Sequence, residues 1–320
     1  MKYSHPTQAL PLLSSLPFVL VIGLISSLSL TGCEEFFEGV VHEVDFPEHE
    51  PALAVTLTID EDAQILRLMV SKTAGVLDPQ GSEVLSDVFA NLEANGTSWL
   101  SLDADDFNGD LHSLALDAPV HLAGMPLRLE VEAEGLDPVS AESTMPEKPV
   151  ALAEIELAVD SVLEPWSEEF MVRDRITVDI EGQNGVADWF ILELQSRFLD
   201  PAWGDTATWW LEYMDGPPDP RVNTLRRGEM LVSDQGLGDE DLNQLTFFKD
   251  NLDPDWGYPE MEWRLRISAL SESSAQYLLS MEAYEQADGN PFAEPVVVYS
   301  NISSGFGHFG LRNSVMIELE

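Results

Sequence analysis

The chain is poor in cysteine and in positive charge. Cys33 is the single cysteine in 320 residues, so no disulfide can form within one chain. Lysine and arginine together number 15, against 58 aspartate and glutamate residues, which gives a formal net charge of −43. Because nucleic-acid binding depends on lysine and arginine contacts to phosphate, this balance argues against nucleic acid as a partner. It also argues against electrostatic docking onto anionic lipid.

The sequence also lacks the motifs that mark common catalytic and metal sites. No histidine falls in an H-E-x-x-H spacing, and there is no G-x-S-x-G. The histidines are His5, His42, His49, His112, His121 and His308. The carboxylates are so numerous that none of them stands out as an acid–base pair. We therefore predict a protein that is not an enzyme and needs no cofactor.

The hydrophobic content is that of an ordinary folded protein. Hydrophobic residues make up 44% of the chain, which is too much for a disordered one.

The charge of −43 implies self-repulsion, which dissolved salt would partly screen. This leads to the hypothesis that the protein works in saline surroundings.

An apolar run near the start of the chain ends at the lone cysteine. Lys2 is the only formal charge before Cys33, and the run is densest over residues 18–30. This is the layout of a secretory signal peptide. An uncleaved transmembrane helix over residues 9–30 is the first alternative, and two prolines within that stretch weaken it. A Cys33 that is only a small buried hydrophobe is the second.

The residues around the cysteine favour lipidation over both alternatives. Leu30, Thr31, Gly32 and Cys33 resemble a bacterial lipobox. The small Thr31 and Gly32 would let an extended backbone enter a peptidase site, and the Cys33 thiol would take up the lipid. We therefore predict that residues 1–32 are a removed signal peptide. Cys33 would then anchor the mature chain in a lipid bilayer through acyl groups such as palmitate.

The residues after the cysteine predict a tether and a location. Residues 33–50 are acidic, contain proline and show little periodicity, as a tether would. Glu34 and Glu35 directly after the cysteine resemble the Bacteroidota signal for export to the outer face of the outer membrane. Ordinary linker acidity in an acidic protein is the alternative.

The rest of the chain predicts an all-β protein in two parts. Residues 52–59 and 65–71 alternate between apolar and polar side chains, and such strands recur at short intervals. We predict an immunoglobulin-like β-sandwich over residues 51–148. Residues 149–320 predict a larger β-sandwich domain with one or two short helices. In that part we expect a helix over 271–286, capped by Ser271 or Ser273, and closing strands over 295–299 and 315–319.

Two groups of side chains are candidate binding sites. The first is a weak calcium candidate, because its spacing fails the EF-hand pattern and its Asn-Gly pair is a standard hairpin turn. It consists of Asp103, Asp105, Asp106, Asn108 and Asp110. The second is a set of aromatic residues in Gly-, Pro- and Asp-rich sequence, which could stack on a glycan, anchor a protein partner, or cap the core beneath long loops. It consists of Trp203, Trp209, Trp210, Tyr213, Trp256 and Tyr258.

The end of the chain carries a family resemblance. Residues 290–302 read NPFAEPVVVYSNI and residues 303–310 read SSGFGHFG. These stretches resemble the "P-F-x-E-P-V … S-N-I … G-x-G-x-F-G" ending of the domain of unknown function 4249 family of Bacteroidota-type surface lipoproteins. The resemblance covers the mature chain and is loose between about residues 199 and 255. It implies a non-catalytic accessory component that works with a TonB-dependent outer-membrane transporter. A glycan-binding module that uses the loop tryptophans and a scaffold without a small ligand are the alternatives.

The physical chemistry of this ending predicts a chain reversal fixed to a core. Gly305, Gly307 and Gly310 permit a positive φ or a close approach of two backbones. We expect Phe306 and Phe309 to be buried. Asn301 would bond to its own backbone in a turn. A phosphate-cradling loop is the alternative, but the stretch lacks the lysine and the following helix of such loops.

Overall fold

The computed structural model describes most of the chain after the expected tether. The described residues are 49–75, 78–106, 112–115, 121–163, 170–182, 188–225, 228–234, 242–251, 260–288 and 294–320. The expected signal peptide, the lipobox and nearly all of the tether lie outside them. Residues Glu50–Glu320 form one compact unit.

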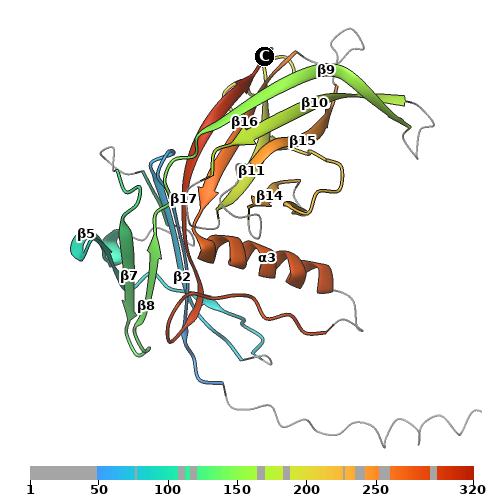
Figure 1. Ribbon diagram of the computed structural model, residues 1–320. Helices are drawn as coiled ribbons and strands as arrows, with labels where there is room; N and C mark the ends of the chain where they lie inside the picture. The colour runs from blue at the N-terminus through green and yellow to red at the C-terminus, as the bar shows by residue number, and fades with distance from the viewer. Residues whose placement is uncertain are drawn as a thin grey trace, which may run out of the picture. The chain divides into compact units, whose positions relative to one another are not determined.

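This unit is built mostly of strands, as the sequence predicts (Figure 1). Its first strands are β1 (Leu53–Asp60), β2 (Ile65–Lys72), β3 (Glu83–Val84), β4 (Val88–Ala94), β5 (Thr97–Leu102), β6 (His112–Ala115), β7 (Pro126–Ala133) and β8 (Val139–Thr144). The later ones are β9 (Ala151–Leu163), β10 (Phe170–Ile180), β11 (Trp189–Phe198), β12 (Trp210–Glu212), β13 (Val222–Thr224), β14 (Met230–Ser233), β15 (Leu242–Asp250), β16 (Met261–Leu270) and β17 (Phe306–Leu319). A 3-10 turn, η1 (Ala104–Asp106), and a helix, α3 (Glu272–Ala287), complete the described elements.

A ten-stranded sheet runs through the whole unit. Its order is β13-β14-β11-β16-β17-β1-β2-β3, with β12 added on β11 and β6 on β2. The first strand, β1, pairs in parallel with the last strand, β17, and every other pairing in this sheet is antiparallel. The two ends of the folded unit therefore meet in the middle of its largest sheet.

Two smaller sheets form sandwich layers with one face of the large sheet. The sheet β5-β4-β7-β8 packs on the β1, β2 part and encloses a core that includes Leu57, Leu92 and Leu129. The sheet β15-β10-β9 packs on the β11, β16 part, where Phe190 and Phe247 are fully buried. The all-β sandwich prediction is thus confirmed.

One strand belongs to both cores. The predicted division between residues 148 and 149 falls between β8 and β9. The first core, however, takes Phe309 and Leu311 from the start of β17, and Val315 and Ile317 further along the same strand pack against the second core. Between them Asn313 is buried and donates to Glu61 Oε2 (3.2 Å) and to the Pro146 carbonyl oxygen (3.4 Å). A polar contact therefore separates the two apolar cores.

The end of the chain differs from the prediction in one element. Residues 295–299, with their run of three valines, form no strand. Instead β17 begins at Phe306, well before the predicted strand over 315–319, and extends over 14 residues. The reason is tertiary: β17 pairs with β1 along its first half and with β16 along its second, so both halves find partners.

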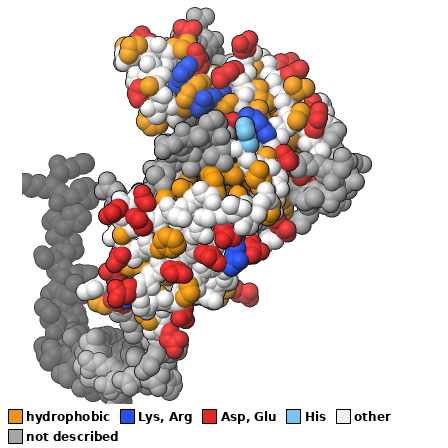
Figure 2. Space-filling model, turned by 90° about the vertical axis from the view of Figure 1, so that its left-hand side faces the viewer, with side chains coloured by type: hydrophobic (Ala, Val, Ile, Leu, Met, Phe, Trp, Pro, Cys, Tyr) orange, Lys and Arg blue, Asp and Glu red, His pale blue; other side chains and the backbone are white. Residues whose placement is uncertain are grey.

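The opposite face of the large sheet carries the helix. Helix α3 packs there over Trp189, Ile191 and Leu270, and its own Ala275 is fully buried in this contact. Polar side chains occupy this face where β1, β16 and β17 continue past the helix. Figure 2 views the molecule from another side, on which acidic side chains are widely spread over the described surface.

Candidate functional site

The start of helix α3 replaces a missing strand beside β17. Strand β16 ends at Leu270, opposite Arg312 of β17, and the chain then turns into the helix. The Leu311 backbone N–H donates to Ser274 Oγ (3.2 Å), and the Ser271 N–H donates to the Leu311 carbonyl oxygen (3.1 Å). The first helical turn thus bonds to the backbone N–H and carbonyl groups of Leu311, which lies beyond the end of the pairing with β16. Ser271 is the N-cap residue, as predicted, but its side chain makes no capping bond to the backbone.

Asn301 satisfies the next position of the same edge. Its Oδ1 accepts from the Phe309 N–H (2.8 Å) and its Nδ2 donates to the Phe309 carbonyl oxygen (2.9 Å). The Asn301 side chain thereby makes the two backbone hydrogen bonds to Phe309 that a neighbouring strand would make. The prediction that Asn301 bonds its own backbone in a turn was wrong, because its partner lies eight residues along the chain.

The glycines of the chain ending allow close backbone approach, as predicted. Gly307 has a φ of +111°, and a Cβ on it would lie 2.0 Å from the Val55 carbonyl oxygen. A Cβ on Gly305 would lie 2.6 Å from the Leu53 carbonyl oxygen. Of the two phenylalanines, Phe309 is fully buried, whereas Phe306 is 56% exposed, contrary to the prediction. The alternation of β17 explains this, because Phe306 and Phe309 lie on opposite faces of the strand.

His308 connects the helix to the sheet. Its imidazole stacks on the Tyr277 ring, with centroids 4.3 Å apart and planes 2° apart. The imidazole also covers Gly310, where a Cβ would lie 2.2 Å from His308 Cε1. Burial lowers the pKa of His308 to about 4, so the ring is neutral near pH 7. Its Nε2 is buried and has no hydrogen-bond partner among the described residues.

A buried charge cluster lies next to this contact. Asp60, 2% exposed, binds Arg266 and accepts from Arg312 Nε (2.9 Å) and Nη2 (2.8 Å). Glu193 Oε2 lies 3.8 Å from Arg266 Nε and from Arg312 Nη1. Burial raises the pKa of Asp60, but the guanidinium groups of Arg312 and Arg266 outweigh it and hold that pKa below its ordinary value. Two carboxylates and two guanidinium groups thus balance one another across four neighbouring strands.

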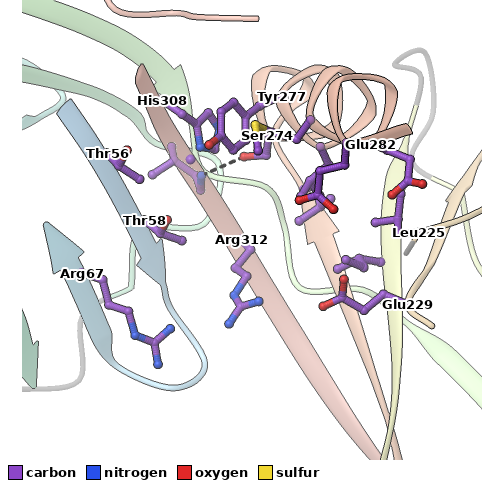
Figure 3. Close-up of a pocket in the computed structure, with 17 residues that line it drawn as sticks. Thr56, Thr58, Arg67, Leu225, Glu229, Ser274, Tyr277, Glu282, His308 and Arg312 are labelled. Carbon is purple, nitrogen blue, oxygen red and sulfur yellow. Dashed lines mark hydrogen bonds between the residues drawn. The ribbon is translucent and has the colours of Figure 1, made fainter. Parts of the chain in front are cut away.

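Helix and sheet together line an open cavity of about 440 Å³ (Figure 3). This volume lies in the range of small-molecule sites. Its polar strand wall consists of Thr56, Thr58, Arg67, His308, Gly310 and Arg312. Its apolar wall includes Ile191, Leu225, Leu270, Tyr277, Leu278 and Met281. Glu229, Glu282 and Glu285 line it as well.

The predicted aromatic residues lie elsewhere and differ in exposure. Trp209 contacts two guanidinium groups, with Arg264 Cζ 3.9 Å and Arg197 Cζ 4.6 Å from its ring centroid. It therefore acts as a packing element on the β11 and β16 side chains. Trp203, Trp210 and Tyr213 are 57%, 50% and 64% exposed and remain available for contact. Trp256 and Tyr258 lie outside the described residues.

The other predicted site residues are only partly described. Asp103 and Asp106 bond to the backbone of the η1 turn: Asp103 Oδ1 accepts from the Asp105 N–H, and Asp106 Oδ2 from the Asp103 N–H. Asn108, Asp110 and the lipobox with Cys33 lie outside the described part of the chain. Within the described part, no group of three His, Cys, Asp or Glu side chains is placed to hold a metal ion. No helix in the same part is both long and apolar enough to cross a membrane.

Sequence reasoning missed the cavity, because its walls come from distant parts of the chain. The alternation of β1 and β2 predicts that Thr56, Thr58 and Arg67 share one face. No local pattern reveals that His308 and Tyr277 meet them there. The glycine two residues after His308 is the one available signal, and it indicates a close approach without identifying the partner.

These observations define the class: an all-β protein of sandwich layers with a helix that closes a cavity on the open face of its main sheet. No family model matches the chain, and no curated protein matches it. Among solved structures, the chain is similar to Sidekick-1 immunoglobulin domains 1-5 (11% identity, TM-score 0.19, covering 86% of this chain and 41% of that one). It is also similar to Sidekick-1 immunoglobulin domains 1-4 (10% identity, TM-score 0.19, covering 86% and 51%). The chain thus spans about half the length of these proteins or less. Because the TM-score is low, the fold class is assigned from the strands and sheets of this structure alone.

Proposed function

We propose that this protein is a lipoprotein anchored through acylated Cys33 to the outer membrane and facing the cell exterior. It acts there as a non-catalytic accessory component of a TonB-dependent transporter. One observation carries the anchoring: the lone cysteine directly follows Leu30, Thr31 and Gly32 at the end of an apolar run with a single charge before it.

Three further features support the location and the role. Glu34 and Glu35 follow the anchor and resemble the Bacteroidota signal for export to the outer face of the outer membrane. A net charge of −43 suits a chain that does not dock onto anionic lipid headgroups by electrostatic attraction. The resemblance of residues 290–310 to that family's ending supplies the transporter as the expected partner.

Purification of the tagged protein from native membranes tests the proposal. The protein is labelled with an alkyne analogue of palmitate and isolated from the outer-membrane fraction. We expect the label on the wild type and co-purification of a large outer-membrane transporter. Cys33→Ala removes the only thiol that can accept the lipid, so the label and the membrane fractionation should both be lost.

Thr31→Ala is the matched control, because it keeps a small residue before the cysteine and should remain lipidated. Membrane fractionation of Cys33→Ala equal to wild type contradicts the anchor. Lipidated protein that repeatedly elutes without any transporter contradicts the partner and leaves the anchor intact.

A further inference from the structure

We propose that the cavity between helix α3 and strands β1, β2 and β17 binds a small monocarboxylate with an apolar body. The cavity and its lining do not depend on the lipid anchor, so this inference can fail or succeed independently of the proposed function. The cavity offers one guanidinium without an ion pair among the described residues, a set of neighbouring polar groups and a facing apolar wall.

Arg67 is the arginine whose guanidinium has no ion pair, hydrogen bond or ring contact among the described residues. The other described arginines each have an ion pair, a hydrogen bond or a ring contact. Arg67 is exposed and has none of these within the described part of the chain. Because the chain has 58 acidic residues and only 15 basic ones, an arginine with no carboxylate partner among the described residues is unexpected. Arg312 also lines the cavity, but Asp60 already neutralises it.

Further polar groups lie beside Arg67 in register. Thr58 pairs with Arg67 on β2 and with Gly310 on β17, and Thr56 pairs with His308. Because Gly310 has no side chain, the His308 imidazole lies over it and brings a second polar group into the row. Neither threonine hydroxyl has a hydrogen-bond partner among the described residues, and neither does the buried His308 Nε2. The Arg67 guanidinium and the hydroxyl of its cross-strand neighbour Thr58 can donate to one carboxylate, whose geometry suits the planar arginine fork.

The remaining walls limit the size and charge of the ligand. Leu278 and Met281 of α3, with Ile191 and Leu270 of the sheet, face the polar row and would cover an apolar body. Glu282 and Glu285 belong to helix α3, and Glu229 directly precedes β14. Figure 3 shows Glu229 and Glu282 on the side opposite β2. One guanidinium without a described ion pair and a facing apolar wall fit a single anionic head with an apolar body.

Calorimetric titration of the native lipidated protein in lipid nanodiscs tests this inference, with empty nanodiscs as the baseline. The probes are 3-phenylpropanoate and its neutral amide, 3-phenylpropanamide, which share one apolar body. We expect the carboxylate to bind more tightly than the amide, and Arg67→Gln to weaken carboxylate binding by about tenfold or more while leaving the amide unaffected. Thr58→Val should weaken carboxylate binding to a smaller extent.

Two variants separate the cavity from general effects. Arg128→Gln removes an exposed, ion-paired arginine of β7 and should bind like wild type. Met281→Trp narrows the apolar wall and should weaken both probes. Absence of heat from wild type with either probe overturns the proposal, as does an Arg67→Gln variant that still prefers the carboxylate. Inorganic phosphate that binds as tightly as the carboxylate overturns the ligand class.

Discussion

At the scale of single residues, His308 shows how a titratable side chain can serve as a packing element. Its ring fills the space above Gly310 and stacks on Tyr277, so that helix and sheet meet through two flat surfaces. Burial keeps the imidazole neutral by lowering its pKa. A proton on this ring would place a charge in a buried position where no described group accepts a hydrogen bond from Nε2.

This arrangement predicts a loss of stability in acid. The folded pKa of His308 is about 4, against an ordinary value of 6.5. Below pH 6.5 His308 becomes protonated in the unfolded chain but stays neutral in the folded protein. The free energy of unfolding therefore falls until the pH reaches about 4. Between pH 7 and 4.5 we expect wild type to lose about 2–3 kcal/mol more than His308→Phe, which keeps a flat ring but does not titrate. Urea unfolding at both pH values measures the difference.

Tyr277→Phe provides the control for this measurement. It keeps both the imidazole and an aromatic ring stacked on it, so it should follow the wild-type pH dependence. Parallel curves for wild type and His308→Phe would show that the imidazole titrates normally in the folded protein and would contradict the prediction.

Residue-level reasoning from sequence was most limited for the aromatics. Trp209 and Trp210 are adjacent and look equivalent in the sequence. The structure places Trp209 against Arg197 and Arg264 and leaves Trp210 half exposed. The difference arises because side chains at successive positions point in different directions, and only the neighbouring strands determine which direction is covered.

At the scale of elements, β17 is the strand on which the unit depends. It pairs with β1 in parallel, with β16 in antiparallel fashion, and packs into both cores. The sequence predicted the strands β1 and β2 well, because both alternate clearly between apolar and polar side chains. It predicted only the second half of β17. Glycines at 305, 307 and 310 hide the strand character of the first half, since glycine has low strand propensity.

Gly307 gives the sharpest test of this strand pairing. Gly307→Ala places a methyl group against the Val55 carbonyl oxygen at a φ of +111°. We expect a loss of about 3 kcal/mol or more in the free energy of unfolding, from backbone strain and overpacking together. Gly81→Ala is the matched control, because Gly81 also has a positive φ, of +68°, but has no atom near its Cβ position. It should cost about 1–2 kcal/mol. Equal losses for the two variants would mean that the close approach of β1 and β17 adds no destabilisation beyond that of the positive φ.

At the scale of the whole molecule, charge is the dominant property. The few cations are mostly used in specific pairs, such as Lys249 with Asp174 and Arg173 with Asp215. Most carboxylates therefore remain without a cation, and their mutual repulsion acts on the folded state more than on the expanded one.

The thermal stability should accordingly depend on salt. We expect the melting temperature at neutral pH to rise by several degrees between low and molar sodium chloride. For a domain of this size, about 1 kcal/mol corresponds to roughly 2–4 °C. Repeating the melts near pH 4, where many carboxylates are protonated, should largely remove the salt dependence. A melting temperature at neutral pH that does not change with salt would contradict the saline-environment hypothesis.

The sequence by itself determined the all-β class, the acidity of the chain and most of the strands, because these follow from composition and from local alternation. It also provides the whole basis for the predicted lipid anchor, since the residues around Cys33 lie outside the described structure. Only the tertiary structure decided that β1 pairs with β17, that the two cores share one strand, and that Arg67, Thr58, His308 and Tyr277 line one cavity. These are contacts between residues far apart in the chain, and no local pattern specifies which distant partner a given face will meet.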